Sequence, residues 1–332
     1  MREKERKYCY GMYTLMFLLM CMAAFLPFFM GGKNFVWGAG VEDGLSQHFS
    51  ALAYYGELLR EFVKNLIAGH PKLMMWNMSL GYGADVIATL NYYAIGDPLN
   101  LLYGFVPVKY TEIMYNFMIL FRMYLAGIAF ILYARKMKKR TYGTVIGALV
   151  YVFCGFCFRL GLRHPFFLNP MIYFPLLCLG IEKIYQKQRP YLFIVMIYVS
   201  AISNYYFFYM LTIFSVIYAW IRFYKYTEKD RIKNFFLTIL KFGGYYILGI
   251  CMAAVILIPS VIGFLGNGRY GSGTDWKALI VYPGKYYLMF LENFVGYGNV
   301  GSNTNTGYLP IAGIVVLFLS LIHISEPTRL QL

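Results

Sequence analysis

Long apolar segments are the feature that most restricts how this chain can fold. Hydrophobic residues make up 60% of the 332 residues and charged residues only 14%, which is too little polar surface to cover an aqueous globule. About 20 apolar residues in a helix cross a bilayer. We therefore predict an all-α polytopic membrane protein with about eight transmembrane helices, near residues 10–31, 113–134, 143–158, 166–184, 190–203, 205–223, 235–258 and 308–322.

One of these apolar runs, residues 191–223, has an ambiguous length. It is too long for a single crossing and slightly short for two. Ser203 and Asn204 place polar side chains near its middle. We expect the run to divide there into two helices, with the turn at the outer face of the membrane.

Basic residues gather in short clusters between the apolar runs, and they set the expected orientation. A net charge of +15 in a soluble protein would suggest a nucleic-acid partner. Here the clusters follow the positive-inside pattern of cytoplasmic loops, so no nucleic-acid partner is expected. If every run crosses once, one side of the membrane carries the clusters at residues 2–7, 135–140, 187–189 and 222–233. The N-terminus is therefore expected in the cytoplasm.

The first loop on the opposite side, residues 32–112, is long and only moderately polar, so we expect it to fold against the membrane. Apolar side chains recur at helical spacing at Phe49, Leu52, Tyr55, Leu59, Phe62 and Leu66. This pattern predicts an interfacial helix over residues 47–67, lying flat on the outer leaflet. Asp97 followed by Pro98 predicts a second short helix, which Asp97 caps at its N-terminus.

The acidic residues of this loop are candidates for chemistry. Glu42 and Asp43 are the first acidic residues after the first apolar run, and Asp97 lies further along the loop. A carboxylate close to hydrocarbon is costly, so it tends to be solvated, to cap a helix or to serve as a reactive group. The residues alone leave these three alternatives open.

Several short motifs follow one another in a fixed order. They are Glu42-Asp43-Gly44 with Gln47, Met75-Trp76-Asn77, Leu80-Gly81-Tyr82-Gly83, Tyr92-Tyr93, Asp97-Pro98-Leu99-Asn100 and Asn204-Tyr205-Tyr206-Phe207. The ordered set, within residues 10–310, resembles the YfhO family of bacterial membrane proteins, which is similar to the GT-C glycosyltransferases. The resemblance implies a multi-pass enzyme of the bacterial cell membrane. Such an enzyme would move a sugar from a polyprenyl-phosphate donor to a cell-surface acceptor such as teichoic acid.

The resemblance also implies roles for the acidic residues. In GT-C enzymes the acidic residue after the first helix acts as the catalytic base, and Asp43 is the match here, with Glu42 beside it. Asp97 is the second candidate. Such a base takes the proton of the attacking hydroxyl. Gln47 lies one turn beyond Asp43, so we expect it to orient that carboxylate or a sugar hydroxyl.

Other residues of the outer loops are candidates for binding the donor. Arg163 and Arg269 lie in predicted outer loops and are suited to a phosphate, although Arg269 could equally bind lipid headgroups non-specifically. The residue Asn204 lies at the predicted turn between two helices, and we include it among the candidate substrate-binding residues. Trp76, Tyr92 and Tyr93 allow two interpretations. Their rings could stack on a sugar or isoprenoid, or they could pack at the membrane interface.

Metal binding is not expected from local spacing. His48 lacks a second histidine or a paired carboxylate at ligand spacing, so we interpret it as a side chain at headgroup level that is available to substrate. No cofactor is certain from the sequence, and a divalent metal is left open.

Two other classes of function compete with the enzyme. A lipid or polymer flippase should carry charged groups within its helices, and the predicted spans contain few, namely Arg122, Glu182 and Lys241. A non-catalytic subunit for cell-envelope assembly is the other alternative. We expect residues 1–318 to form one GT-C-like module. Residues 319–332 look like the translation of a sequencing-library adapter on a truncated chain, so the native gene is expected to continue.

Overall fold

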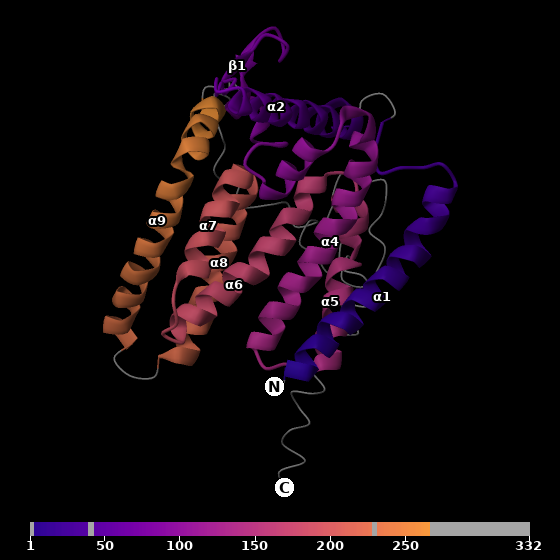
Figure 1. Ribbon diagram of the computed structural model, residues 1–332. Helices are drawn as coiled ribbons and strands as arrows, with labels where there is room; N and C mark the ends of the chain where they lie inside the picture. The colour runs from indigo at the N-terminus through magenta and orange to yellow at the C-terminus, as the bar shows by residue number, and fades with distance from the viewer. Residues whose placement is uncertain (1–2, 39–42, 228–230, 266–332) are drawn as a thin grey trace, which may run out of the picture.

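The computed structural model describes residues 3–38, 43–227 and 231–265, and this part of the chain is a bundle of helices (Figure 1). The one β element in these ranges is a small hairpin of β1 (Trp76–Asn77) and β2 (Ala84–Asp85). The helices are α1 (Glu3–Met30), α2 (Ser50–Ile67), α3 (Val86–Leu90), α4 (Thr111–Lys136), α5 (Thr141–Val152), α6 (Asn169–Tyr185), α7 (Tyr191–Ser203), α8 (Tyr205–Tyr226) and α9 (Arg231–Leu265).

Five helical segments in the described ranges are long and apolar enough to cross a membrane. They lie at Lys7–Met30, Val108–Lys136, Pro165–Tyr185, Tyr205–Tyr226 and Arg231–Gly263. Each matches a predicted span, which confirms an all-α membrane protein. Helices α5 and α7 match two further predicted runs, but their 12 and 13 residues extend only about 18–20 Å. The predicted span at 308–322 lies outside the described residues, so eight crossings stay a prediction.

The outward faces of the long helices are apolar, as lipid contact requires. On α9, Leu240 is 75% and Val255 is 78% exposed, and on α8 Trp220 is 58% exposed. Apolar surface on this scale is rare in soluble monomers and is stable against lipid tails. The lipid bilayer is therefore the partner that the fold itself requires.

Helices α4 and α6 form the centre of the bundle. Most of α6 is buried, and α1 with α5 lies on one side of it while α7, α8 and α9 lie on the other (Figure 1). Helix α1 approaches α4 closely at Gly127, where an added Cβ would come within 1.9 Å of the Tyr13 hydroxyl. That hydroxyl donates to the carbonyl of Tyr124 at 3.1 Å. The tight contact fixes the first helix against the core.

The basic clusters lie at one end of the bundle, which we call the basic end. Lys136 donates to the Gln188 side chain at 3.1 Å, and Gln186 donates to the Tyr226 hydroxyl at 3.1 Å. The Arg135 guanidinium lies 5.5 Å from the centre of the Tyr10 ring. Segments far apart in the sequence therefore meet here, as the expected gathering of the clusters on one side requires.

Helix α2 crosses the opposite end of the bundle, which we call the loop end, and the β hairpin lies beyond it (Figure 1). Leu52 and Tyr55 of the predicted apolar face are buried, whereas Leu66 near the end of α2 is 51% exposed. Arg60 donates to the carbonyl of Tyr103, which ties α2 to the turn η2 (Pro98–Phe105). The prediction of an amphipathic surface helix is confirmed.

The predicted division of residues 191–223 is also confirmed, but its turn is buried. Asn204 separates α7 from α8, and its side-chain oxygen Oδ1 accepts from the backbone N–H groups of Tyr206 and Phe207 at 3.1 Å each. Its amide donates to the carbonyl of Tyr92 at 2.9 Å. The first loop therefore covers this polar turn, and the predicted position of the turn on the outer side of the membrane stays a prediction.

Candidate functional site

Asp43 stands at the start of the π-helical turn η1 (Gly44–Phe49), next to α2. Its side chain makes no capping hydrogen bond there, so the capping alternative for Asp43 is wrong. Instead Gln47 donates to Asp43 Oδ1 at 2.9 Å, and the Tyr93 hydroxyl donates to Gln47 at 2.6 Å. Gln47 therefore contacts this carboxylate, which is one of its two predicted partners, and Tyr93 in turn holds Gln47.

The π turn explains why several side chains converge on Asp43. Its backbone hydrogen bonds join residues five apart, so positions four and five after Asp43, Gln47 and His48, stay near the same face. Gly44 permits the turn, because an added Cβ would lie 2.6 Å from the carbonyl oxygen of Trp37. A larger residue there would separate η1 from the segment that carries Trp37.

His48 meets a second histidine from a distant part of the chain. Its Nε2 lies 2.6 Å from Nδ1 of His164, which precedes the short turn η5 (Pro165–Leu168). One ligand atom from each of Asp43, His48 and His164 falls within 4.8 Å of the others. No second histidine lies at ligand spacing from His48 in the sequence, but the fold brings His164 into contact with it. Sequence spacing could not reveal a contact between residues 116 positions apart.

His48 is held in its neutral form. Its side chain is only 3% exposed, and burial, His164 and Arg163 lower its pKa to about 3. The guanidinium of Arg163 lies 5.9 Å from the ring centre of Trp37. Arg163 thus belongs to the same group of side chains, and its positive charge lies close enough to act on His48.

Tyr92 and Tyr93 line the same region. Their rings are 5.0 Å apart and nearly perpendicular, and the His48 ring lies 5.6 Å from that of Tyr93. Burial and neighbouring tyrosines raise the pKa of Tyr92 to about 12, with a further contribution from the charge of Asp43. We call this group the Asp43 cluster, and its members are Asp43, Gln47, His48, Tyr92, Tyr93, Arg163 and His164.

The remaining predicted site residues lie elsewhere. Both polar atoms of the Asn204 side chain are hydrogen-bonded to backbone groups, so Asn204 holds the backbone of Tyr92 and does not face the Asp43 carboxylate itself. Trp76 lies on the β hairpin and is 60% exposed. Glu42 and Arg269 lie outside the described residues, and their predicted roles stay predictions.

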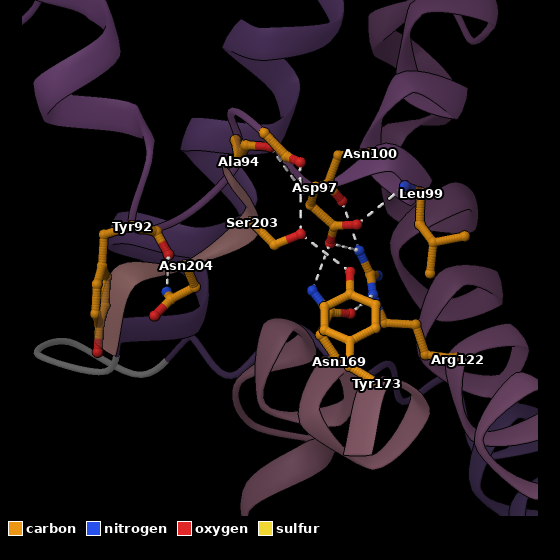
Figure 2. Close-up of polar contacts among 11 residues, drawn as sticks. Tyr92, Ala94, Asp97, Leu99, Asn100, Arg122, Asn169, Tyr173, Ser203 and Asn204 are labelled. Atoms are coloured by element: carbon orange, nitrogen blue, oxygen red, sulfur yellow. Dashed lines mark hydrogen bonds and ion pairs between the residues drawn. The ribbon is translucent and has the colours of Figure 1, made fainter. Parts of the chain in front are cut away.

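Asp97 occupies a second, buried network between the loop and the helix core (Figure 2). Its Oδ1 accepts from the backbone of Leu99 at 2.9 Å, which confirms the predicted cap. Its Oδ2 accepts from Arg122 at 2.8 Å and from Asn169 at 2.7 Å. Arg122 also donates to Asn100 at 2.6 Å and to Asn169 at 3.0 Å.

This network joins the first loop to both central helices. Arg122 belongs to α4 and is 1% exposed, Asn169 begins α6, and both oxygens of Asp97 are occupied by protein donors. The geometry therefore favours a positioning duty for Asp97. The sequence did contain a signal for the pair, because a lone arginine within an apolar span requires a carboxylate partner.

Comparison with known proteins supplies the family. The family model described as "Bacterial membrane protein YfhO" matches residues 12–329. The chain belongs to the YfhO family. A curated relative, the "Uncharacterized protein YfhO" of Bacillus subtilis (strain 168), is 27% identical over 277 residues, which cover 75% of this chain and 31% of the relative. The chain thus spans just under a third of that relative, and no solved structure matches it.

Membership in the YfhO family confirms the resemblance drawn from the ordered motifs. The matched range contains every residue of the Asp43 cluster and of the Asp97 network. The name of the relative assigns no activity. What the site does must therefore be inferred from its chemistry.

Proposed function

We propose that this YfhO-family protein is a GT-C-type glycosyltransferase of the bacterial cell membrane. It would move a sugar from a polyprenyl-phosphate donor to a cell-surface acceptor such as teichoic acid. One observation carries the proposal: a carboxylate fixed by Gln47 and Tyr93 lies in one cluster with an arginine. The cluster is at the loop end, which the positive-inside rule assigns to the outer face, with the N-terminus in the cytoplasm.

The chemistry of transfer outside the cell fits this arrangement. Nucleotide sugars are not available there, so the donor must be carried by a lipid, with its phosphate near the headgroup plane. Asp43 takes the proton of the acceptor hydroxyl, whose oxygen bonds to the anomeric carbon as the bond from that carbon to the phosphate oxygen breaks. Arg163 stabilises the charge on the departing polyprenyl phosphate.

The aromatic residues complete the proposed site. Tyr92 and Tyr93 flank the carboxylate and provide ring faces on which a sugar can stack. Asn204 fixes the backbone of Tyr92, so the buried turn between α7 and α8 supports the site indirectly. Glu42, Trp76 and Arg269 stay secondary candidates for this donor site.

Two of the charged groups within the predicted spans, Arg122 and Glu182, favour an enzyme over a lipid or polymer flippase. Arg122 is paired with Asp97, and Glu182 accepts from Arg222 at 2.9 Å and from Tyr218 at 2.7 Å. Charges that are held by protein partners in this way stabilise packing, whereas a translocation path needs groups that exchange partners with its cargo. A non-catalytic assembly subunit is best separated from the enzyme by experiment.

The experiment is Asp43→Asn in the full-length protein, expressed in cells that lack the native copy. Asparagine preserves the shape of the side chain and its bond to Gln47, but it cannot act as the base. We expect surface glycosylation to be lost while membrane insertion is unchanged. Asp85→Asn is the matched control, because Asp85 caps α3 by accepting from Ala88 at 2.6 Å and asparagine caps equally well. Wild-type glycosylation in the Asp43→Asn cells would instead favour the assembly subunit.

A further inference from the structure

Two of the four histidines of the chain meet in the Asp43 cluster, although they are 116 positions apart. Their nitrogens are 2.6 Å apart, and the rings are nearly perpendicular, at 78°. An Asp43 oxygen lies within 4.8 Å of both ligand nitrogens. The cluster therefore combines two imidazoles and one carboxylate from two separate segments at a single point.

The contact between the two rings is buried and involves only nitrogen atoms. The His48 side chain is 3% exposed, and its Nε2 faces Nδ1 of His164. An imidazole nitrogen without its proton is a metal ligand. A cation bound between the rings would therefore replace the hydrogen bond between these two nitrogens with two bonds to metal.

The separations suit a transition metal after small side-chain movements. Zn²⁺ binds histidine nitrogen and carboxylate oxygen at about 2.0–2.2 Å, so two of its tetrahedral ligands lie about 3.4 Å apart. To reach that geometry, the two histidine nitrogens would have to move apart by less than about 1 Å. The Asp43 oxygen would have to move towards them by at most about 1.4 Å. Rotations of the side chains provide shifts of this size.

We propose that Asp43, His48 and His164 bind a divalent transition cation, with Zn²⁺ as the best fit. Imidazole suits Zn²⁺ and related metals, whereas Mg²⁺ and Ca²⁺ prefer sites built from oxygen ligands. Three protein ligands leave a fourth position of the tetrahedron open, which is the arrangement of catalytic rather than structural zinc sites. Gln47 and Tyr93 form the outer layer that orients the carboxylate ligand.

The use of this cation rests on the proposed function. Its open position would accept an oxygen of the donor phosphate, next to the guanidinium of Arg163, and so share the charge of the departing group. A carboxylate offers about four lone-pair sites, and Gln47 occupies one of those on Asp43. Asp43 can therefore ligate the cation and still take the proton of the acceptor hydroxyl.

Binding of Zn²⁺ alone to the purified protein in lipid nanodiscs tests the proposal without any glycosyl donor. After chelation and dialysis, titration calorimetry should find about one tight site per chain, and Co²⁺ should give the visible absorption bands of a tetrahedral site. His48→Gln and His164→Gln should weaken Zn²⁺ binding by more than about 100-fold, since even outer partners contribute about 10–100-fold. Both variants should lose the Co²⁺ bands.

His70→Gln is the matched control, because His70 is exposed beyond the far end of α2. It should bind both metals like the wild type, and circular dichroism should confirm that every variant is folded. Wild-type Zn²⁺ affinity and Co²⁺ bands in His48→Gln and His164→Gln would overturn the proposal, as would the absence of a tight site in the wild type. The metal site would stand, and the glycosyltransferase proposal would fall, if Zn²⁺ bound as expected while Asp43→Asn kept full surface glycosylation.

Discussion

At the scale of single residues, Asp43 and Asp97 show how one side chain type serves two purposes in the same loop. Gln47 holds one oxygen of Asp43, and the carboxylate lies in a cluster of groups suited to substrate or metal. Asp97 caps a turn and neutralises Arg122, with donors on both oxygens. The first arrangement favours chemistry and the second favours stability.

Asp97→Asn should lower the stability of the protein strongly. Asparagine keeps the cap, but it leaves the buried guanidinium of Arg122 without a counter-charge. Breaking a buried pair in this way costs about 3–5 kcal/mol. Reversible unfolding of the protein in detergent measures the loss.

Asp85→Asn again provides the control for this prediction. Asp85 also caps a helix, but it does so from a partly exposed position. Its replacement should change the free energy of unfolding by well under about 1 kcal/mol. Equal losses in the two variants would show that capping, and not the pair with Arg122, explains the effect at Asp97.

At the scale of elements, the site depends on how the first loop meets the turn between α7 and α8. Asn91 donates to the carbonyl of Ile202 at 2.7 Å, and Asn204 donates to that of Tyr92 at 2.9 Å. Gly96 closely approaches the same carbonyl of Ile202 and has a φ of +90°. Tyr92 and Tyr93 are therefore placed by a loop that is bonded to a buried helix end.

Gly96→Ala should disturb this junction. An alanine Cβ would come within 1.9 Å of the Ile202 carbonyl oxygen, in a backbone conformation that side chains disfavour. We expect a loss of more than about 1 kcal/mol in the free energy of unfolding. Gly69→Ala separates the two causes, because Gly69 has a φ of +80° but open space around it. If the two variants lost the same stability, close approach to α7 would play no part.

The helices themselves were largely predictable from the sequence. Apolar runs located α1, α4, α6, α8 and α9, since only helices satisfy their backbone within hydrocarbon. The division at Ser203 and Asn204 followed from polar residues in an apolar run. Local spacing did not indicate the π turn η1, whose form depends on the packing of Gly44 against Trp37.

The site was only partly predictable, because its contacts join distant segments. Gln47 lies one turn from Asp43, so their bond followed from helical spacing. His164 meets His48 only through the fold, and no local pattern indicates that contact. Arg122 was visible as a charge in an apolar span. That it pairs with Asp97 depends on how the first loop folds back onto the helices.

At the scale of the whole molecule, two ends of opposite character define the protein. The basic end joins segments that carry the positive clusters, and the loop end carries α2, the β hairpin and the Asp43 cluster (Figure 1). Apolar helix faces lie between them. This division predicts one orientation in the membrane, with the candidate site outside the cell.

Cysteine labelling in intact cells tests that orientation. Lys72→Cys lies in the exposed first loop and should react with an impermeant reagent, whereas Lys139→Cys at the basic end should react only after the cells are opened. A version of the protein without its native cysteines removes the background. Labelling of the Lys139→Cys protein, but not of the Lys72→Cys protein, in intact cells would reverse the topology and place the Asp43 cluster inside.

The most direct test of the central claim uses the purified full-length protein in nanodiscs, with a polyprenyl-phosphate-linked sugar and a cell-surface acceptor. The measured quantity is the rate at which polyprenyl phosphate is released. We expect release coupled to transfer in the wild type and in Asp85→Asn. Asp43→Asn should be slower by at least about 100-fold, because a general base contributes about 10²–10⁴-fold to such a step. Equal rates for the wild type and Asp43→Asn would contradict the assignment of Asp43 as the base.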